Sequence, residues 1–318
     1  MNLISTLKGS NYEKIMPAGW DFAKMDACVE QSRNPDSIYD RQGYWNDQFT
    51  LIGCESVEDF NAKMGYELAA QIKNSRDAGE KLALIIPVGP MGIYQWALYF
   101  LKQWNVKCDH VWGFNMDEWA DAAGNTFPAS HPYSFEYCMT QTFYGPLGEL
   151  TVPENQRNFA TKENLPTYAG KISELRDKGA KLITVYGIGR MMHIAFWEPH
   201  FAADYESEDE WRAADHRIAG NLHPLTIEQC TLTSFRGRTN LATCWGNTIG
   251  PGLFLASDYV IGGADGVFGR GMSWQGMSLW VTLKHGPTTW IPSTFMPTLP
   301  GKLFFVDELK GPIDVDYN

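Results

Sequence analysis

The sequence predicts an α/β fold, a mostly parallel sheet with helices on both faces, and two stretches point to it most directly. Residues 81–87, KLALIIP, form a nearly continuous apolar run, as expected for a parallel strand that is covered on both faces. Residues 184–199, TVYGIGRMMHIAFWEP, lead from a β-branched and aromatic run through a Gly-x-Gly turn to His193 and Glu198. Open α/β sheets bind their ligands at such carboxyl ends of strands. The alternation of strand and helix patterns along the whole chain completes the prediction.

The elements follow from apolar spacing, capping residues and turn residues. Ser56 is placed to cap a helix over 56–72, whose first turn is acidic and whose apolar residues recur at helical intervals. Pro132 suits the first turn of a helix over 131–143. Further strands are expected at 49–52, 111–114, 182–186 and 303–306, and further helices from 93, at 162–179, around 226–235 and near 272–284. An apolar region is noted at 253–261. A Gly-rich turn is expected at 262–271. The polar segment 200–217 is interpreted as a mobile lid.

Composition limits the classes of function. The chain has 318 residues, 44% hydrophobic and 20% charged, with 12 Trp, 14 Tyr and 17 Phe, which argues against disorder. Its net charge of −11 disfavours broad contact with nucleic acid or anionic membranes. Six scattered cysteines without CxxC pairs indicate reduced residues, and no signal peptide or long apolar span is present, so we expect a cytoplasmic protein.

The chain shows no internal repeat and no linker. We therefore expect a single α/β domain over residues 48–318. Residues 1–47 are polar, rich in Trp and Tyr and weakly periodic, and they are expected to form an N-terminal extension packed on that domain.

Two pairs of residues are candidates for acid–base chemistry. Asp117 and Glu118 follow the strand at 111–114, and His193 and Glu198 follow the strand at 182–186. A carboxylate that accepts a hydrogen bond from an imidazole holds the ring in one tautomer, as general acid–base catalysis requires. On spacing alone a structural histidine with an exposed glutamate is an equally open interpretation, and adjacent acids commonly cap a helix or face solvent.

Metal and cofactor motifs are weak. His193, Glu198 and His200 contain no H-E-x-x-H pattern, so no metal is expected. Gly187-Ile188-Gly189 lacks the third glycine of a dinucleotide fingerprint, because Arg190 and two methionines follow it. We expect no cofactor.

Four stretches together resemble one family. FNMDEW (114–119), HPYSFEYCMTQTFYGPL (131–147), GIGRMMHIAFWEP (187–199) and IIPVGPMGIYQWAL (85–98) are similar to signature segments of glucosamine-6-phosphate deaminases/isomerases. The resemblance covers roughly residues 48 to 310. It implies a three-layer α/β/α sandwich with a Rossmann-like sheet, and an aldose–ketose isomerisation of an amino sugar phosphate with loss of ammonia.

The resemblance also implies roles for individual residues. The aspartate of FNMDE, which moves a proton between C2 and C1 of the sugar, falls on Asp117, next to Glu118. The histidine before Ile-Ala-Phe, which assists ring opening, falls on His193, and the glutamate that supports it falls on Glu198. Carboxylate and imidazole suit these proton transfers.

The chain departs from the family in the carboxylate relay of the histidine and in the phosphate loop. The family has Asp-Gly before the histidine, where this chain has Met191-Met192, and the phosphate loop here reads Val88-Gly89-Pro90-Met91, without the usual hydroxyl donors. We expect arginines to bind an anionic group of the substrate instead, because the planar guanidinium group suits phosphate, sulfonate or carboxylate. The expected substrate-binding residues are Gly89, Pro90, Met91, Gly187, Ile188, Gly189, Arg190, Arg236 and Arg270. We therefore expect a substrate that carries a different group, or none, in place of the 6-phosphate.

Three functions stay open at this point. The first is a sugar or sugar phosphate isomerase/deaminase. The second is a lactone hydrolase of the related 6-phosphogluconolactonase kind, with the histidine as base for water. The third is a non-catalytic sugar-binding protein. All three have a small sugar ligand as partner, and we expect a homo-oligomer. Tyr94, Trp96, Trp119 and Trp197 are candidates for stacking on a sugar face.

Overall fold

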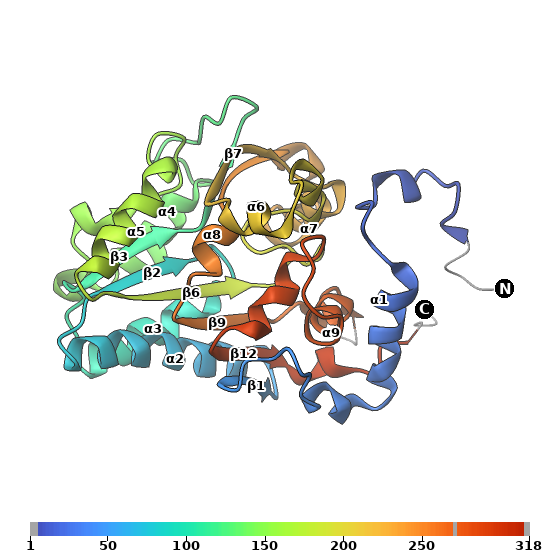
Figure 1. Ribbon diagram of the computed structural model, residues 1–318. Coiled ribbons are helices and arrows are strands. Elements are labelled where there is room, and N and C mark those ends of the chain that lie inside the picture. The colour runs from blue at the N-terminus through green and yellow to red at the C-terminus, as the bar shows by residue number, and fades with distance from the viewer. Residues whose placement is uncertain (1–5, 270–271, 315–318) are drawn as a thin grey trace.

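A seven-stranded parallel sheet forms the centre of the computed structural model, which describes residues 6–269 and 272–314. The strands are β1 (Phe49–Cys54), β2 (Leu82–Ile86), β3 (Val111–Asn115), β5 (Arg157–Asn158), β6 (Lys181–Gly187), β9 (Tyr259–Ala264) and β12 (Gly301–Val306). Their order across the sheet is β1-β12-β9-β6-β2-β3-β5, and every neighbouring pair is parallel. The predicted α/β class is confirmed (Figure 1).

The sheet is covered on both faces because successive side chains of each strand point to opposite sides. In β2, Leu82, Leu84 and Ile86 belong to the core beneath α2 (Val57–Asp77) and α3 (Gly92–Gln103). Ala83 and Ile85 belong to the opposite core. That second core is closed by α5 (Tyr168–Asp177), α8 (Pro251–Phe254) and α9 (Gly276–Lys284). The layers are visible in Figure 1, with α2 and α3 under the sheet.

Several predicted helices occur with altered bounds. Ser56 caps α2, its Oγ accepting a hydrogen bond from the Asp59 amide at 3.1 Å, but the helix continues to Asp77. α4 (Phe135–Met139) is shorter than the predicted helix at 131–143 and passes into a π-helical turn at Thr140–Tyr144. The helix expected around 226–235 is α7 (Pro224–Ser234).

The interpretation of residues 200–217 as a lid is wrong. This segment contains α6 (Glu208–Ala213), whose Trp211 is fully buried and stacks on Phe295 with ring centroids 5.0 Å apart. Its polar residues form the outer face of a packed element.

A small antiparallel sheet beyond the end of β3 was not predicted. It consists of β4 (Asp117–Ala120), β8 (Trp245–Ile249) and β7 (His216–Asn221), with Asp117 opposite Thr248. Only two strands, β10 (Val267–Gly269) and β11 (Met272–Ser273), form the remaining sheet of the described chain. The β4–β8 pairing turns the chain sharply after Asn115 and fixes the backbone of Asp117 above the main sheet.

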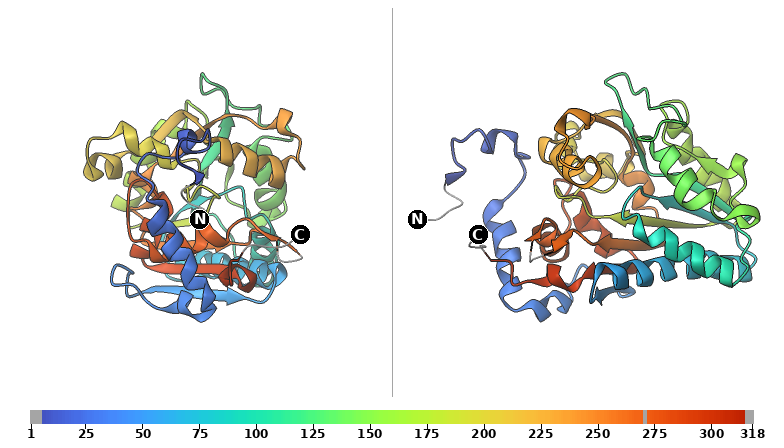
Figure 2. Two further views of the ribbon diagram at one scale, coloured as in Figure 1. Left: turned by 90° about the vertical axis from the view of Figure 1, so that its right-hand side faces the viewer. Right: turned by 180° about the vertical axis from the view of Figure 1, so that it is seen from behind.

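The N-terminal segment contacts the elements behind the Gly-x-Gly turn. α1 (Phe22–Glu30) contributes Met25 and Cys28 to a buried cluster with Met192. The indole of Trp20 donates a hydrogen bond to the Trp290 carbonyl at 2.8 Å. Figure 2 shows this segment at one end of the molecule, away from α2 and α3.

Within residues 6–269 and 272–314, the helices are too short or too polar for any of them to span a bilayer.

Candidate active site

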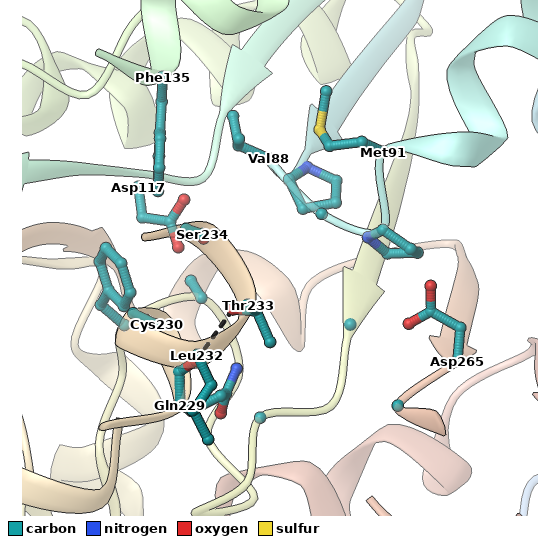
Figure 3. Close-up of a pocket in the computed structure, with 18 of the residues that line it drawn as sticks. Val88, Met91, Asp117, Phe135, Gln229, Cys230, Leu232, Thr233, Ser234 and Asp265 are labelled. Atoms are coloured by element: carbon teal, nitrogen blue, oxygen red, sulfur yellow. Dashed lines mark hydrogen bonds between the residues drawn. The ribbon is translucent and has the colours of Figure 1, made fainter. Parts of the chain in front are cut away.

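A cavity of about 670 Å³ lies where the carboxyl ends of the central strands meet α4, α7 and the segment after β9. Its volume falls within the usual range for small-molecule sites. The cavity contains predicted residues from three strand ends: Gly89, Pro90 and Met91 after β2, Asp117 after β3, and Gly187, Ile188, Gly189 and His193 after β6. Sequence positions more than 100 residues apart thus meet in one pocket (Figure 3).

Asp117 turns its carboxylate into the cavity. The side chain is almost fully buried and accepts no hydrogen bond from any described residue, while Trp119 and Phe135 supply apolar walls next to it. Burial, and after it the neighbouring Glu118 carboxylate, raise the pKa of Asp117 well above its ordinary value of 3.8. An unpaired carboxylate with a raised pKa is a stronger base than an ordinary aspartate.

Glu118 lies in a different environment although it is the next residue. Its carboxylate accepts hydrogen bonds from the amides of Trp119, Phe135 and Glu136 and from the Ser134 hydroxyl, at 2.9–3.0 Å. These donors belong mainly to the first turn of α4, where a negative charge is favourable. Glu118 does not line the cavity; it fixes the start of α4 and with it the position of Phe135.

His193 and Glu198 lie together, as their proposed roles require. The Nδ1 atom of His193 is 3.5 Å from Oε2 of Glu198 and 3.2 Å from the Thr226 hydroxyl. Oε1 of Glu198 accepts the His223 amide at 3.2 Å. Burial opposes ionisation of Glu198, but the His193 ring and the surrounding hydrogen bonds outweigh it and lower the pKa of Glu198 below 4.5. A buried carboxylate beside Nδ1 favours the tautomer in which Nε2 is free to exchange a proton.

Glycines let the strand ends approach one another. A Cβ added to Gly189 would come within 2.0 Å of Nε2 of His193, so a larger residue would displace the imidazole. Gly89 has φ = 116°, which favours glycine. Ile188 is buried, and its amide donates to the Gly263 carbonyl at 3.2 Å, which joins the ends of β6 and β9.

Met191 and Met192 are buried where the resemblance led us to expect Asp-Gly. Met192 adopts φ = 58°, a conformation for which glycine is the usual residue. Its side chain packs with Met25 and Cys28 of α1. The N-terminal segment thus supplies the apolar contacts that hold this strained residue directly before His193.

Arg190 and Arg236, two of the three arginines expected at the site, do not line the cavity. Arg190 forms an ion pair with Glu228, and its amide donates to the Gln229 side chain at 2.7 Å. Arg236 is exposed in the turn after α7, with φ = 51°. Arg270 lies outside the described residues. Among the cavity-lining residues of the described chain, none is arginine or lysine.

Sequence reasoning missed Asp265 and most of the aromatic wall. Asp265 follows β9 directly and lines the cavity; the same signal that marked Asp117, an acid after a buried strand, was available for it. Phe135, Phe196 and Phe235 pack around Trp119 with ring centroids 4.8–6.1 Å apart. They come from three separate segments, and no spacing in the sequence brings them together.

Of the four aromatic residues predicted to stack on a sugar, Trp119 alone lines the cavity. The Tyr94 hydroxyl donates to the Pro87 carbonyl at 2.5 Å beneath the loop, and Trp197 is buried against Phe201. Trp96 packs against Phe100 on the helical layer. No group of three or more His, Cys, Asp or Glu side chains in 6–269 and 272–314 is arranged to hold a metal ion.

Comparison with known proteins gives consistent results. No family model matches the chain. The glucosamine-6-phosphate deaminase of Vibrio campbellii is 24% identical over 197 residues, 61% of this chain and 68% of the relative. That of Aliivibrio fischeri strain MJ11 is 25% identical over 214 residues, 66% of this chain and 74% of the relative.

Solved structures show the same fold. A monomeric glucosamine-6-phosphate deaminase superposes with a TM-score of 0.63 at 16% identity, covering 82% of this chain and 98% of that one. The 6-phosphogluconolactonase of Trypanosoma cruzi gives 0.55 at 17% identity, covering 84% and 98%.

Proposed function

We propose that this chain is a sugar isomerase/deaminase and a divergent member of the superfamily that includes glucosamine-6-phosphate deaminases and 6-phosphogluconolactonases. One observation carries the proposal. An unpaired carboxylate, Asp117, and a His193–Glu198 pair reach the same cavity from the ends of different strands. Ring opening requires a group that moves a proton to the ring oxygen, and proton transfer between two neighbouring sugar carbons then requires a separate base.

Ring opening is assigned to His193. With Nδ1 turned to Glu198, Nε2 accepts the proton of the anomeric hydroxyl and delivers it to the ring oxygen as the C1–O5 bond breaks. Glu198 stays ionised because its pKa is lowered, and it stabilises the imidazolium that forms in between.

Isomerisation is assigned to Asp117. Its carboxylate removes the C2 proton of the open-chain aldose while a water molecule protonates the carbonyl oxygen, which gives the enediol. The protonated Asp117 then delivers a proton to C1 while the C2 hydroxyl releases its proton to water, which leaves a ketose. With an amino group on C2 the product is a ketimine, and its hydrolysis by water releases ammonia. The apolar surroundings raise the pKa of Asp117 and so bring it closer to the much higher pKa of the C2–H group from which it removes a proton.

Glu118 is proposed to act indirectly. Its four hydrogen-bond donors leave it no capacity for proton transfer, and they fix Ser134 and Phe135 at the cavity wall. Gly89, Pro90, Met91, Gly187, Ile188 and Gly189 are proposed to contact the substrate through backbone and apolar groups. Arg190 and Arg236 would have to change their side-chain conformations to reach a ligand in the cavity.

A lactone hydrolase is the second candidate, because His193 with Glu198 suffices to activate a water molecule. The two candidates differ in what happens at C2. An isomerase exchanges the C2 hydrogen of its substrate with solvent deuterium, whereas a lactonase releases acid and leaves C2 unchanged.

The experiment is solvent exchange at C2 followed by NMR, with ammonia release measured on the same sugars and acid release measured on the corresponding sugar lactones. Asp117→Asn should abolish exchange while sugar binding survives. Asp177→Asn, at an exposed position on α5, is the matched control and should exchange at the wild-type rate. Exchange that persists in Asp117→Asn excludes the assigned base, and acid release without exchange supports the lactonase. Oligomeric state, which we propose to be above one chain, is measured by light scattering.

A further inference from the structure

Asp265 faces the cavity from the side opposite Asp117. The strand order β9-β6-β2-β3 puts β6 and β2 between the two strands that precede these acids. Three strand spacings correspond to roughly 14 Å. Figure 3 shows the Asp117 carboxylate on the left of the pocket and the Asp265 carboxylate on the right, with Val88 and Met91 above them. A single ligand held between them would have its reacting carbons at Asp117 and its other end at Asp265.

The backbone that carries Asp265 is fixed. The Gly266 amide donates to Oε1 of Gln275 at 2.6 Å, and Nε2 of Gln275 donates to the Ile188 carbonyl. Asp265 is therefore held against the turn that leads to His193. The Asp265 carboxylate accepts no hydrogen bond from another described residue. Its oxygens are therefore available to accept hydrogen bonds from a ligand in the cavity.

The charges around Asp265 are unsuited to a phosphate. Among the described lining residues there is no lysine or arginine, Arg190 is engaged by Glu228, and Arg236 is exposed outside the lining. The loop after β2 offers Pro90, which has no amide hydrogen, and Met91, which has no side-chain donor. A phosphate dianion beside Asp265 would meet like charge in a cavity of low polarity. A hydroxyl would supply the donor that the carboxylate lacks.

We propose that Asp265 is a specificity-determining residue that accepts a hydrogen bond from the terminal hydroxyl of an unphosphorylated sugar. The proposal rests on the function assigned above, because it assumes that the sugar carbons to be isomerised lie at Asp117. It assigns the substrate class as free aldoses or 2-amino-aldoses with a hydroxyl in place of the 6-phosphate.

The test uses matched pairs of sugars: glucose, glucosamine and galactosamine, each with its 6-phosphate. Binding to the full chain is measured by thermal shift and calorimetry, separately from C2 exchange. We expect the unphosphorylated member of at least one pair to bind roughly tenfold or more tightly than its phosphate, because a built hydrogen-bond acceptor rejects an ill-matched group. Tighter binding of the phosphate, or binding of neither member of any pair, overturns the proposal.

Variants then connect the preference to Asp265. Asp265→Asn should raise KM for the free sugar with little change in kcat and should reduce the preference over the phosphate, whereas Asp265→Glu should restore part of it. An unchanged preference in Asp265→Asn contradicts the proposal. So does a phosphate preference that is lost in Arg270→Ala, since that result would place the anion ligand on Arg270. Preferential binding of a free sugar without C2 exchange would refute the isomerase assignment alone and leave the binding role of Asp265 in place.

Discussion

The two sides of the cavity differ in how closely they follow the deaminase pattern. On the side of Asp117, His193 and Glu198, the residue types that the resemblance led us to expect are present, and the structure brings them to one pocket. On the side of Gly89, Pro90 and Asp265, hydroxyl donors are missing and an acid faces the ligand space. If the proposed function holds, the proton chemistry is that of the deaminases and the recognition of the substrate's other end differs.

The largest effect is expected at the base. Asp117→Asn should lower the rate of C2 exchange by about 10²–10⁴-fold, the usual contribution of a general base. The same variant should be more stable than wild type at neutral pH. Since folding raises the pKa of Asp117, the folded state binds more protons, and ionisation costs stability as pH rises above 3.8. Chemical denaturation at several pH values checks this, and a destabilised Asp117→Asn would indicate a structural aspartate.

The next effect concerns the histidine pair. Glu198→Gln should reduce turnover of a cyclic sugar by about 10–100-fold, because the imidazolium loses its counter-charge. A substrate that cannot cyclise does not need ring opening and should be affected much less. Comparing the two substrates at pH 6–9 measures the role directly. Equal losses on both would mean that Glu198 supports the fold of this segment and has no specific part in ring opening.

Glu118 provides the contrast within the same side of the cavity. Glu118→Gln places amide hydrogens against backbone donors at the start of α4 and should cost about 2–4 kcal/mol of unfolding free energy. Exchange per folded molecule should fall by much less than in Asp117→Asn. Measuring exchange activity and the folded fraction in the same samples distinguishes the two acids. A loss of activity per folded molecule as large as that of Asp117→Asn would mean that Glu118 takes part directly in proton transfer.

On the other side of the cavity, burial raises the pKa of Asp265 from 3.8 to about 6. The unfolded chain ionises first as pH rises, so Asp265 lowers stability progressively between about pH 4 and 6. Asp265→Asn should therefore be more stable than wild type by about 1–3 kcal/mol above pH 7, with no gain below pH 4. Urea unfolding at pH 4 and pH 8 measures the difference. A gain that does not depend on pH would mean that the carboxylate is not desolvated.

The smallest effect is expected at Arg190. Its ion pair with Glu228 is partly exposed, so Arg190→Ala should change stability by less than about 1 kcal/mol. KM should stay within about twofold of wild type, because Arg190 does not line the cavity. Steady-state kinetics on the best substrate of the panel checks this. If Arg190→Ala weakened the binding of phosphosugars alone, Arg190 would be identified as an anion ligand.

The sequence predicted those parts of the molecule that depend on local pattern. Apolar runs marked the strands at 81–87 and 182–186, and Ser56 marked the start of α2. The rule that parallel strands carry ligands at their carboxyl ends correctly placed Asp117 and His193 beside one cavity. These features rely on residues that are close in the chain or on a general property of parallel sheets.

Other features depend on contacts that no local pattern encodes. Asp117 and Glu118 differ in environment because the chain turns into β4 and α4 packs beside it. The amides of α4 donate hydrogen bonds to Glu118, while the Asp117 carboxylate receives none from a described residue. The burial of the Met192 side chain depends on contacts with α1, which lies more than 150 residues earlier in the chain. The pairing of Arg190 with Glu228 depends on the path of α7. The expectation of anion-binding arginines rested on residue type alone, which does not determine where a long side chain lies.

The most direct test of the account is proton NMR of a free 2-amino-aldose or aldose in deuterated buffer with wild-type protein and with Asp117→Asn. We expect that the wild type removes the C2 proton signal, that Asp117→Asn leaves it intact, and that the matching 6-phosphate is a poor substrate. Exchange at an equal rate in both proteins, or exchange confined to the 6-phosphate, would contradict it.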